Sequence, residues 1–195
     1  MAALKEPSTR RRNVAKSKKP IDREIVAQLG QPVLRTVAEE VPAADIHAPE
    51  FQAFIDHMHQ VLADAGGVGL AAPQVFRSQR VFLAAFPDAQ NPEELVVETL
   101  INPTLSNFSP EMEDRWEGCL SFIELMVLVP RHVSLTVDYI DRTGSPNRLQ
   151  LSGFPARVVQ HENDHLDGVL TIDRARSPRQ IIKASEFDDV VESAD

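Results

Sequence analysis

The sequence predicts an α+β domain, and the order of its segments is the main reason. An amphipathic helical pattern is expected near the start and a histidine-bearing helix near the end, with mostly strand-like segments between them. Helical patterns between successive strands, which a doubly wound parallel sheet requires, do not fit this sequence. We therefore expect one or more sheets packed with a small number of helices.

Length and composition are consistent with a single domain. The chain has 195 residues, 43% of them hydrophobic. This length allows one domain with a substantial core over residues 21–195 but is short for two independently folded domains. No run approaches the roughly 18 apolar residues of a membrane span, and the N-terminus lacks the apolar core of a secretory signal. Cys119 is the only cysteine, so no internal disulfide can form and a reducing compartment is the simplest location.

The charge is distributed unevenly along the chain. Residues 1–20 carry +6, while the rest of the chain carries −15 of the total net charge of −9. The basic segment lacks apolar periodicity, so we expect a disordered tail that serves solubility, organelle targeting or RNA contact. The acidic remainder argues against a DNA-binding domain, because neutralising phosphates requires a basic face.

The first ordered elements are expected from residue 21 onward. Gly30–Pro32 is typical of a turn, and residues 33–38 are predicted to follow as an extended or edge segment. A helix is predicted next, with Pro49 in its first turn and Gly66-Gly67 at its end. Its apolar residues recur at helical spacing: Phe51, Phe54, Ile55, Met58, Val61, Leu62 and Ala65.

Strands are predicted for the central part of the chain. Four segments are rich in Val, Leu, Ile and Phe and are separated by Pro, Asn and Gly: residues 80–86, 95–101, 126–140 and 148–154. The turn-forming residues 141–145 predict a hairpin between the last two segments. Ser177-Pro178 can cap and begin a final helix that extends to about residue 191.

The sequence Gln160–Gly168 contains an H-E-x-x-H pattern. If residues 157–167 form a helix, His161 and His165 lie on the same face because they are four residues apart. Both imidazoles can then bind one metal ion, while Glu162 beside them handles the proton of a water molecule that the ion activates.

Two further stretches contain residues suited to a ligand site. Gly67–Gln74 consists mainly of small residues, which let the backbone approach a ligand closely, and it ends in an amide that donates hydrogen bonds. Glu117–Ser121 places Cys119 beside a glycine, as a metal ligand in a tight backbone site would be. The alternatives are a tight turn for the first stretch and a small buried hydrophobic residue for Cys119.

Taken together, these three stretches resemble the motifs of peptide deformylase, in the same order and with similar separations. The resemblance extends to Gly30–Arg35 and Val129–Arg131, so it covers residues 24–172. It implies the α+β fold of that family, with mixed and antiparallel sheets packed around the metal-binding helix. It also implies hydrolysis of the formyl group from formyl-methionyl nascent chains near the ribosome, with release of formate. Bacterial cytoplasm and an organelle interior are both compatible with this activity.

The resemblance also assigns roles to individual residues. Cys119, His161 and His165 would bind the metal, and Glu162 would be the general base and acid. Gln74 and the backbone N–H of Leu120 would form the oxyanion hole. Members of the family favour Fe²⁺, although Zn²⁺, Ni²⁺ or Co²⁺ can occupy the same kind of site, and a Cys-His-His ligand set suits several of these metals.

An apolar pocket for the methionine side chain is the last expected part of the site. The candidates are Val68, Gly69, Phe154 and Val158, although Phe154 and Val158 also fit a plain core role. Glu117 is hypothesised to pair with Arg131 near the metal. The chain departs from the family at Phe122–Met126, where most members have an apolar residue, Pro, and Gly or Glu, often followed by Arg. Arg157 is a second unusual residue near the pocket entrance.

Two alternative functions are compatible with parts of this pattern. A metallopeptidase with H-E-x-x-H usually has a further ligand downstream, but Thr171 stands where the extended motif has His, and Glu186 is the remaining candidate. A non-catalytic, deformylase-like metal-binding module is the second alternative. Neither explains why all the catalytic positions of the family are present.

Overall fold

The computed structural model describes residues 25–88, 90–91 and 93–192. The predicted disordered tail over residues 1–20 lies outside this range. The strands are β1 (Gly69–Ala71), β2 (Val81–Pro87), β3 (Leu95–Ser106), β4 (Met112–Glu117), β5 (Leu125–His132), β6 (Ser134–Ile140), β7 (Pro146–Ser152) and β8 (Ile181–Lys183). The α-helices are α1 (Pro49–Ala65), α2 (Phe154–Leu166) and α3 (Phe187–Glu192).

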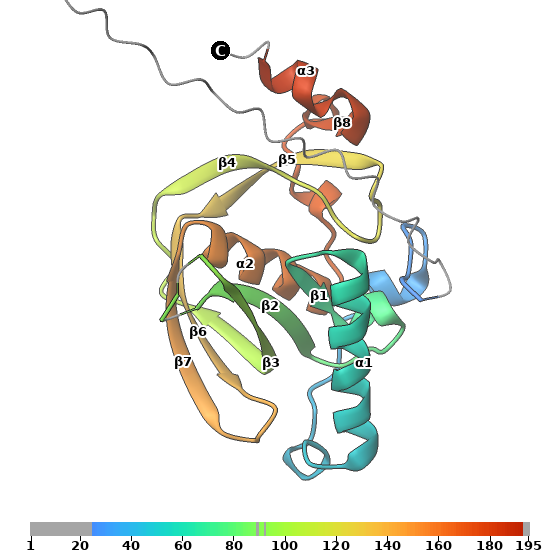
Figure 1. Cartoon of the computed structure of the whole chain (residues 1–195). Coiled ribbons are helices and arrows are strands. Elements are labelled where there is room, and N and C mark those ends of the chain that lie inside the picture. The colour runs from blue at the N-terminus through green and yellow to red at the C-terminus, as the bar shows by residue number, and fades with distance from the viewer. Residues whose placement is uncertain (1–24, 89, 92, 193–195) are drawn as a thin grey trace, which may run out of the picture.

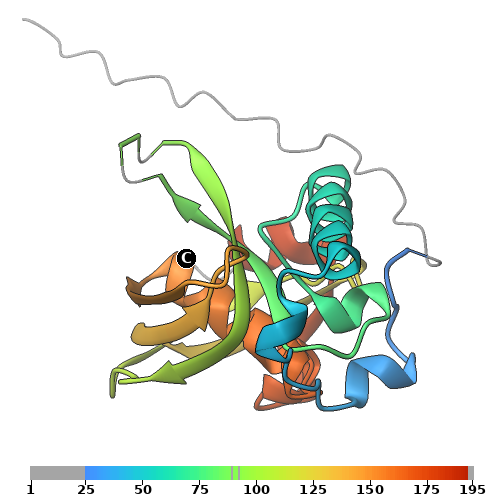
Figure 2. The same cartoon turned by 90° about the horizontal axis from the view of Figure 1, so that it is seen from below.

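Two antiparallel sheets lie on either side of helix α2 (Figure 1). The larger sheet has the order β1-β2-β3-β6-β7, and the smaller sheet has the order β4-β5-β8. Every pairing between these strands is antiparallel. Seen from below, the β2–β3 hairpin extends away from the body on the side where α1 stands (Figure 2). The α+β prediction is confirmed, including the hairpin between β6 and β7.

Helix α1 forms where the apolar periodicity predicts it. Pro49 occupies its first turn, and Gly66 ends it in the left-handed conformation at φ 62°, where glycine has no side chain to strain. Its buried face packs into a core with β1 and β2. The helix residues in this core are Phe51, Ile55, Met58, Val61 and Leu62.

Helix α2 is buried on two chemically different faces. Its apolar face packs on the larger sheet through Ala156, Val159 and Leu166. Its polar face is directed toward β4 and β5 and carries Arg157, His161 and Asp164, all of them buried. Buried polar groups are stable only when they are hydrogen-bonded or bind a ligand, so this face must have partners on the smaller sheet.

The structure corrects three sequence-based predictions in the first and middle parts of the chain. The segment predicted as extended over residues 33–38 begins as a short 3₁₀ helix, Pro32–Arg35, because Pro32 has a backbone φ suited to a first turn and Leu34 is buried against the core. The strand predicted over residues 126–140 is two strands in different sheets, separated at Val133. Strands β1 and β4 were not predicted.

The predicted helix over residues 177–191 is also wrong. Ser177 caps only the short 3₁₀ helix Pro178–Gln180, and the chain then runs as β8 along the edge of β5. The helical start signal is local, whereas Ile182 reaches its strand position through pairing with Met126. Helix α3 begins only at Phe187. Within the described residues, no helix is long and apolar enough to cross a membrane.

Candidate active site

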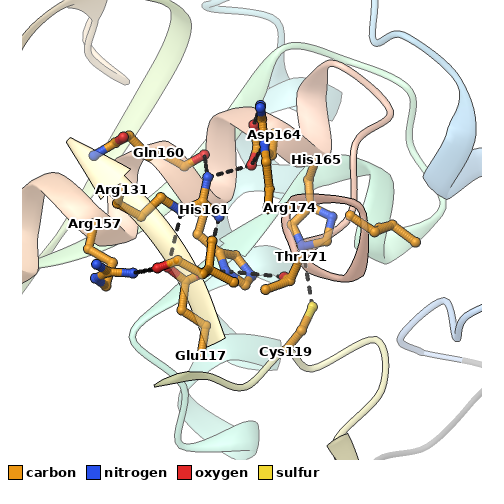
Figure 3. Close-up of polar contacts among 12 residues, drawn as sticks. Glu117, Cys119, Arg131, Arg157, Gln160, His161, Asp164, His165, Thr171 and Arg174 are labelled. Carbon is orange, nitrogen blue, oxygen red and sulfur yellow. Dashed lines mark hydrogen bonds and ion pairs between the residues drawn. The ribbon is translucent and has the colours of Figure 1, made fainter. Parts of the chain in front are cut away.

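The structure brings Cys119, His161 and His165 together at one point. One ligand atom from each residue lies within 4.8 Å of the other two. The Sγ atom of Cys119 lies 3.3 Å from Nε2 of His165. Cys119 is on the loop after β4, and the two histidines are one helical turn apart on α2, so their rings point to the same side (Figure 3). A cluster of ligand atoms predicted from separate motifs is therefore present.

The geometry and chemistry of this cluster suit a transition metal ion. Metal–ligand bonds of about 2.0–2.3 Å in a tetrahedral site place the ligand atoms about 3.3–3.8 Å apart, close to the separation of Cys119 and His165. The Nδ1 atom of His161 lies 2.9 Å from Oε2 of Glu117, which leaves its Nε2 available. A carboxylate that fixes the outer nitrogen of a histidine is a recurrent feature of metal sites.

The two histidines have opposite pKa shifts. Burial, together with the nearby His161 and Arg131, lowers the pKa of His165 well below its usual value, so His165 is neutral and able to bind a metal. Burial opposes the charged form of His161, but hydrogen bonds with Cys119 and Glu117 raise its pKa well above the usual range. Protons therefore compete with a metal ion mainly at His161.

A buried ion-pair network supports the polar face of α2. Arg131 donates from Nε and Nη2 to the two carboxylate oxygens of Glu117, each at 3.0 Å, and from Nη1 to Asp164 at 2.5 Å. Arg174 pairs with Asp164 from the other side. Burial would raise the pKa of Glu117, but hydrogen bonds from His161 and Arg131 hold it well below the usual value. The hypothesised Glu117–Arg131 pair is present, and Glu117 stays ionised.

Glu162 is buried beside the ligand cluster, and its carboxylate is not tied up by a partner in the described part of the chain. Its Oε2 has no hydrogen-bond partner among the described residues. Burial raises the pKa of Glu162 to about 7. A carboxyl group whose pKa lies near neutrality can both accept and donate a proton. A buried oxygen without a partner is a feature that a bound ligand or water molecule would explain.

Gln74 is buried and held in one orientation. Its Oε1 accepts a hydrogen bond of 2.8 Å from the backbone N–H of Ala71, which directs Nε2 toward Ser121 Oγ at 3.2 Å and Cys119 Sγ at 3.6 Å. The backbone N–H of Leu120 donates to no other group within the described part of the chain. Two N–H donors are thus placed near the thiol.

A cavity of about 490 Å³ opens onto this cluster. It is lined by nine of the ten predicted site residues: Val68, Gly69, Gln74, Cys119, Leu120, Phe154, Val158, His161 and Glu162. His165 is fully buried behind them. Further lining residues that were not predicted for the site are Trp116, Ile123, Met126 and Ala184.

The unpredicted lining residues differ in whether the sequence contained a signal for them. Ile123 and Met126 belong to the segment that departs from the family pattern, so that departure falls in the cavity wall. Ala184 reaches the cavity because β8 pairs with β5, which no local pattern indicates. Glu186, the third ligand required by the metallopeptidase alternative, is exposed and lies outside the ligand cluster.

Comparisons with known proteins point to one family. The sequence matches the family described as polypeptide deformylase over residues 23–180. It is 42% identical to peptide deformylase 2 of Nostoc sp. over 169 residues, which covers 85% of this chain and 93% of that protein. It is 44% identical to a peptide deformylase of Treponema pallidum over 154 residues, covering 78% of this chain and 88% of that protein.

Two solved structures are similar in fold. A Met-Ala-Ser-bound class I type b peptide deformylase from Acinetobacter baumannii superposes with a TM-score of 0.71 at 36% identity, covering 76% of this chain and 96% of that one. A peptide deformylase from Synechococcus elongatus in complex with actinonin has a TM-score of 0.71 at 35% identity, covering 84% and 85%. Sequence and fold comparisons therefore agree on the same family.

Proposed function

Because the chain belongs to the peptide deformylase family, we propose that it removes the formyl group from N-formylmethionyl nascent polypeptides in a metal-dependent hydrolysis that releases formate. The observation that carries this proposal is the convergence of Cys119, His161 and His165 on a cavity that also contains Glu162 and Gln74. We place the reaction in the bacterial cytoplasm, close to the ribosomes that supply the substrate, with an organelle interior as the alternative.

Cys119, His161 and His165 would hold a single divalent ion, which we propose is Fe²⁺. Zn²⁺, Ni²⁺ and Co²⁺ suit the same sulfur and nitrogen donors. When bound, such an ion lowers the pKa of a water molecule from 15.7 to about 7 and polarises the carbonyl group of the substrate. Three protein ligands leave a fourth position open for this chemistry.

Glu162 is proposed as the group that moves the proton. Its pKa of about 7 lets the carboxylate take a proton from the attacking water at neutral pH. The same carboxyl group then gives that proton to the amine nitrogen of methionine as the bond to the formyl carbon breaks. No hydrogen bond within the described residues holds Oε2 of Glu162, so this carboxylate is not committed to another protein group.

Gln74 and Leu120 are proposed to stabilise the oxygen that becomes negatively charged. The hydrogen bond from Ala71 fixes the side-chain amide of Gln74, so its N–H groups are held beside the thiol and close to the proposed ion. The backbone N–H of Leu120 is the second donor. Such donors are worth about 3–4 kcal/mol each when they are pre-oriented toward the developing charge.

The methionine side chain is proposed to lie against the apolar wall of the cavity. Val68 and Phe154 line the cavity and are 37% and 50% exposed, so their apolar surface is accessible to a ligand. Val158 and Gly69 complete this wall. An apolar wall beside an ionised site would admit an uncharged N-formyl group and exclude the charged amine of an unformylated peptide.

A paired-substrate assay tests the proposal. Met-Ala-Ser, the tripeptide bound in the Acinetobacter baumannii structure, is formyl-Met-Ala-Ser without its formyl group. The protein loaded anaerobically with Fe²⁺ should release one formate per formyl-Met-Ala-Ser and leave Met-Ala-Ser intact. Cleavage of a peptide bond in either tripeptide would support the metallopeptidase alternative, and metal binding without any turnover would support the non-catalytic one.

A further inference from the structure

Arg157 is a buried cation that the proposed chemistry does not use. It is 6% exposed, lines the cavity and lies one helical turn before His161 on α2. It belongs to the first turn of that helix, where the helix dipole disfavours a positive charge. Burial and position both oppose an arginine here, so its contacts must offset a considerable cost.

Those contacts converge on the carboxylate that holds His161. Nη1 of Arg157 donates to Oε1 of Glu117 at 2.7 Å and to the backbone oxygen of Val129 at 3.0 Å. Nη2 donates to the backbone oxygen of Glu113 at 2.5 Å. The guanidinium group is therefore fixed to β4 and β5 as well as to Glu117 (Figure 3 shows the Glu117 contact).

The carboxylate of Glu117 is held from three directions. Arg131 contacts both of its oxygens, and Oε2 also receives Nδ1 of His161 at 2.9 Å. Arg157 supplies the remaining contact, to Oε1, on the side of the cavity. Residues 157 and 161 lie on the same face of α2, one helical turn apart. The side chains of Arg157 and His161 therefore both contact the carboxylate of Glu117.

Arg157 is the second arginine that contacts Glu117, beside Arg131. Glu117 and Asp164 are both buried carboxylates, and Arg131 is shared between them. Arg174 compensates Asp164 from a half-exposed position and makes no contact with Glu117. Without Arg157, the only arginine in contact with Glu117 within the described residues would be Arg131, which also binds Asp164. Oε1 of Glu117 would then accept a hydrogen bond from Nε of Arg131 alone.

We propose that Arg157 is a positioning residue for the metal centre: by holding Glu117 against α2, it fixes the ring orientation of His161 toward the ion. This inference rests on the metal site of the proposed function. A residue that orients a metal ligand through its partner typically changes metal affinity by 10–100-fold when it is removed.

Three variants and cobalt binding test this role. Arg157→Met removes the charge and keeps most of the length, and Arg157→Lys keeps the charge but cannot make all three contacts. Arg174→Met is the matched control, because it removes an arginine from the same network on the Asp164 side. The Co²⁺ dissociation constant would be measured by chelator competition, and the visible spectrum of the Co²⁺-loaded protein would report the geometry of the ligands.

We expect Arg157→Met to raise the Co²⁺ dissociation constant at least about 10-fold and to shift the visible bands. Arg157→Lys should stay within about threefold of the parent, and Arg174→Met should leave affinity and spectrum unchanged. If Arg157 only fills space and binds carbonyl groups, the charge it carries would not matter. Arg157→Lys and Arg157→Met would then weaken Co²⁺ binding equally, and this result would overturn the inference. If the Met variant does not fold, a 10-fold loss in the Lys variant would overturn it.

The outcome for the parent protein separates this inference from the proposed function. A parent that binds one Co²⁺ tightly, together with an Arg157→Met variant of equal affinity and spectrum, would overturn the role of Arg157 alone. A parent that binds no Co²⁺ at Cys119, His161 and His165 would overturn the metal site and this inference together.

Discussion

The carboxyl group of Glu162 packs against the Cα atom of Gly69, in the space that any side chain at position 69 would occupy. An added Cβ atom there would lie 2.7 Å from Cδ and 2.9 Å from Cγ of Glu162. Both separations are shorter than van der Waals contact, so a side chain at position 69 would force the carboxylate of Glu162 out of its present position. Gly69 of the Gly67–Gln74 stretch thus leaves the space in which the carboxylate of Glu162, the proposed base, lies.

Replacing this glycine should displace Glu162 without disrupting the fold. In Gly69→Ala the flexible Glu162 side chain would move away from the new methyl group, and a displacement of about 1 Å can cost about 10²-fold in rate. We expect kcat to fall about 10²-fold or more, while metal content and thermal unfolding of the metal-loaded protein change little. Unchanged kcat would show that Glu162 can move without consequence, and loss of metal would show that Gly69 supports the ligands instead.

Glu162→Gln should separate proton transfer from metal binding. The amide has nearly the same size as the carboxyl group but cannot accept and return a proton. Turnover of formyl-Met-Ala-Ser should be abolished, while elemental analysis finds the same metal content as in the parent. Normal turnover, or loss of the metal, would contradict the proposed role.

The same substitution should change how the stability of the metal-free protein depends on pH. The folded-state pKa of Glu162 is raised from 4.5 to about 7, so its contribution to stability is fully present below pH 4.5 and is lost as the pH rises through 7. Relative to the parent, Glu162→Gln should therefore be more stable at pH 8 than at pH 5, by up to about 3 kcal/mol. Urea unfolding of both metal-free proteins at the two pH values measures this difference, and parallel pH profiles would contradict the raised pKa.

Gln74→Ala should reduce the chemical step more than substrate binding. The lost N–H donor would interact with the formyl oxygen most strongly as negative charge develops, so kcat should fall about 10²–10³-fold with a smaller change in KM. Gln74→Met, which keeps most of the volume, controls for the cavity that Ala leaves. An effect confined to KM in both variants would mean that Gln74 only holds the peptide.

The sequence predicted the parts of this molecule that depend on local spacing. Apolar residues three and four apart define α1, and the four-residue separation of His161 and His165 places both on one face of α2. The site residues could be assembled only because the resemblance joined three motifs that are far apart in the chain. Their convergence on one cavity then follows from α2 lying between the two sheets.

Features that depend on pairing between distant segments could not be predicted in this way. Ile181 and Ile182 belong to a strand because they pair with Val127 and Met126 at the edge of β5. The local signal at Ser177-Pro178 favours a helix instead. Arg157 looked unusual in the sequence, but its partner Glu117 is 40 residues away on another element. No local sequence pattern indicates that the carboxylate of Glu117 is buried next to Arg157 and compensates the charge of this arginine.

The central claim is that Cys119 is a metal ligand, and the metal content of Cys119→Ser tests it most directly. A thiolate binds a divalent ion at neutral pH because the ion favours its deprotonated form, whereas a serine hydroxyl stays protonated. Elemental analysis of the purified variant, compared with the parent prepared in the same way, should find most of the metal lost and formyl-Met-Ala-Ser uncleaved. A full equivalent of tightly bound metal in Cys119→Ser would contradict the three-ligand site and the function proposed from it.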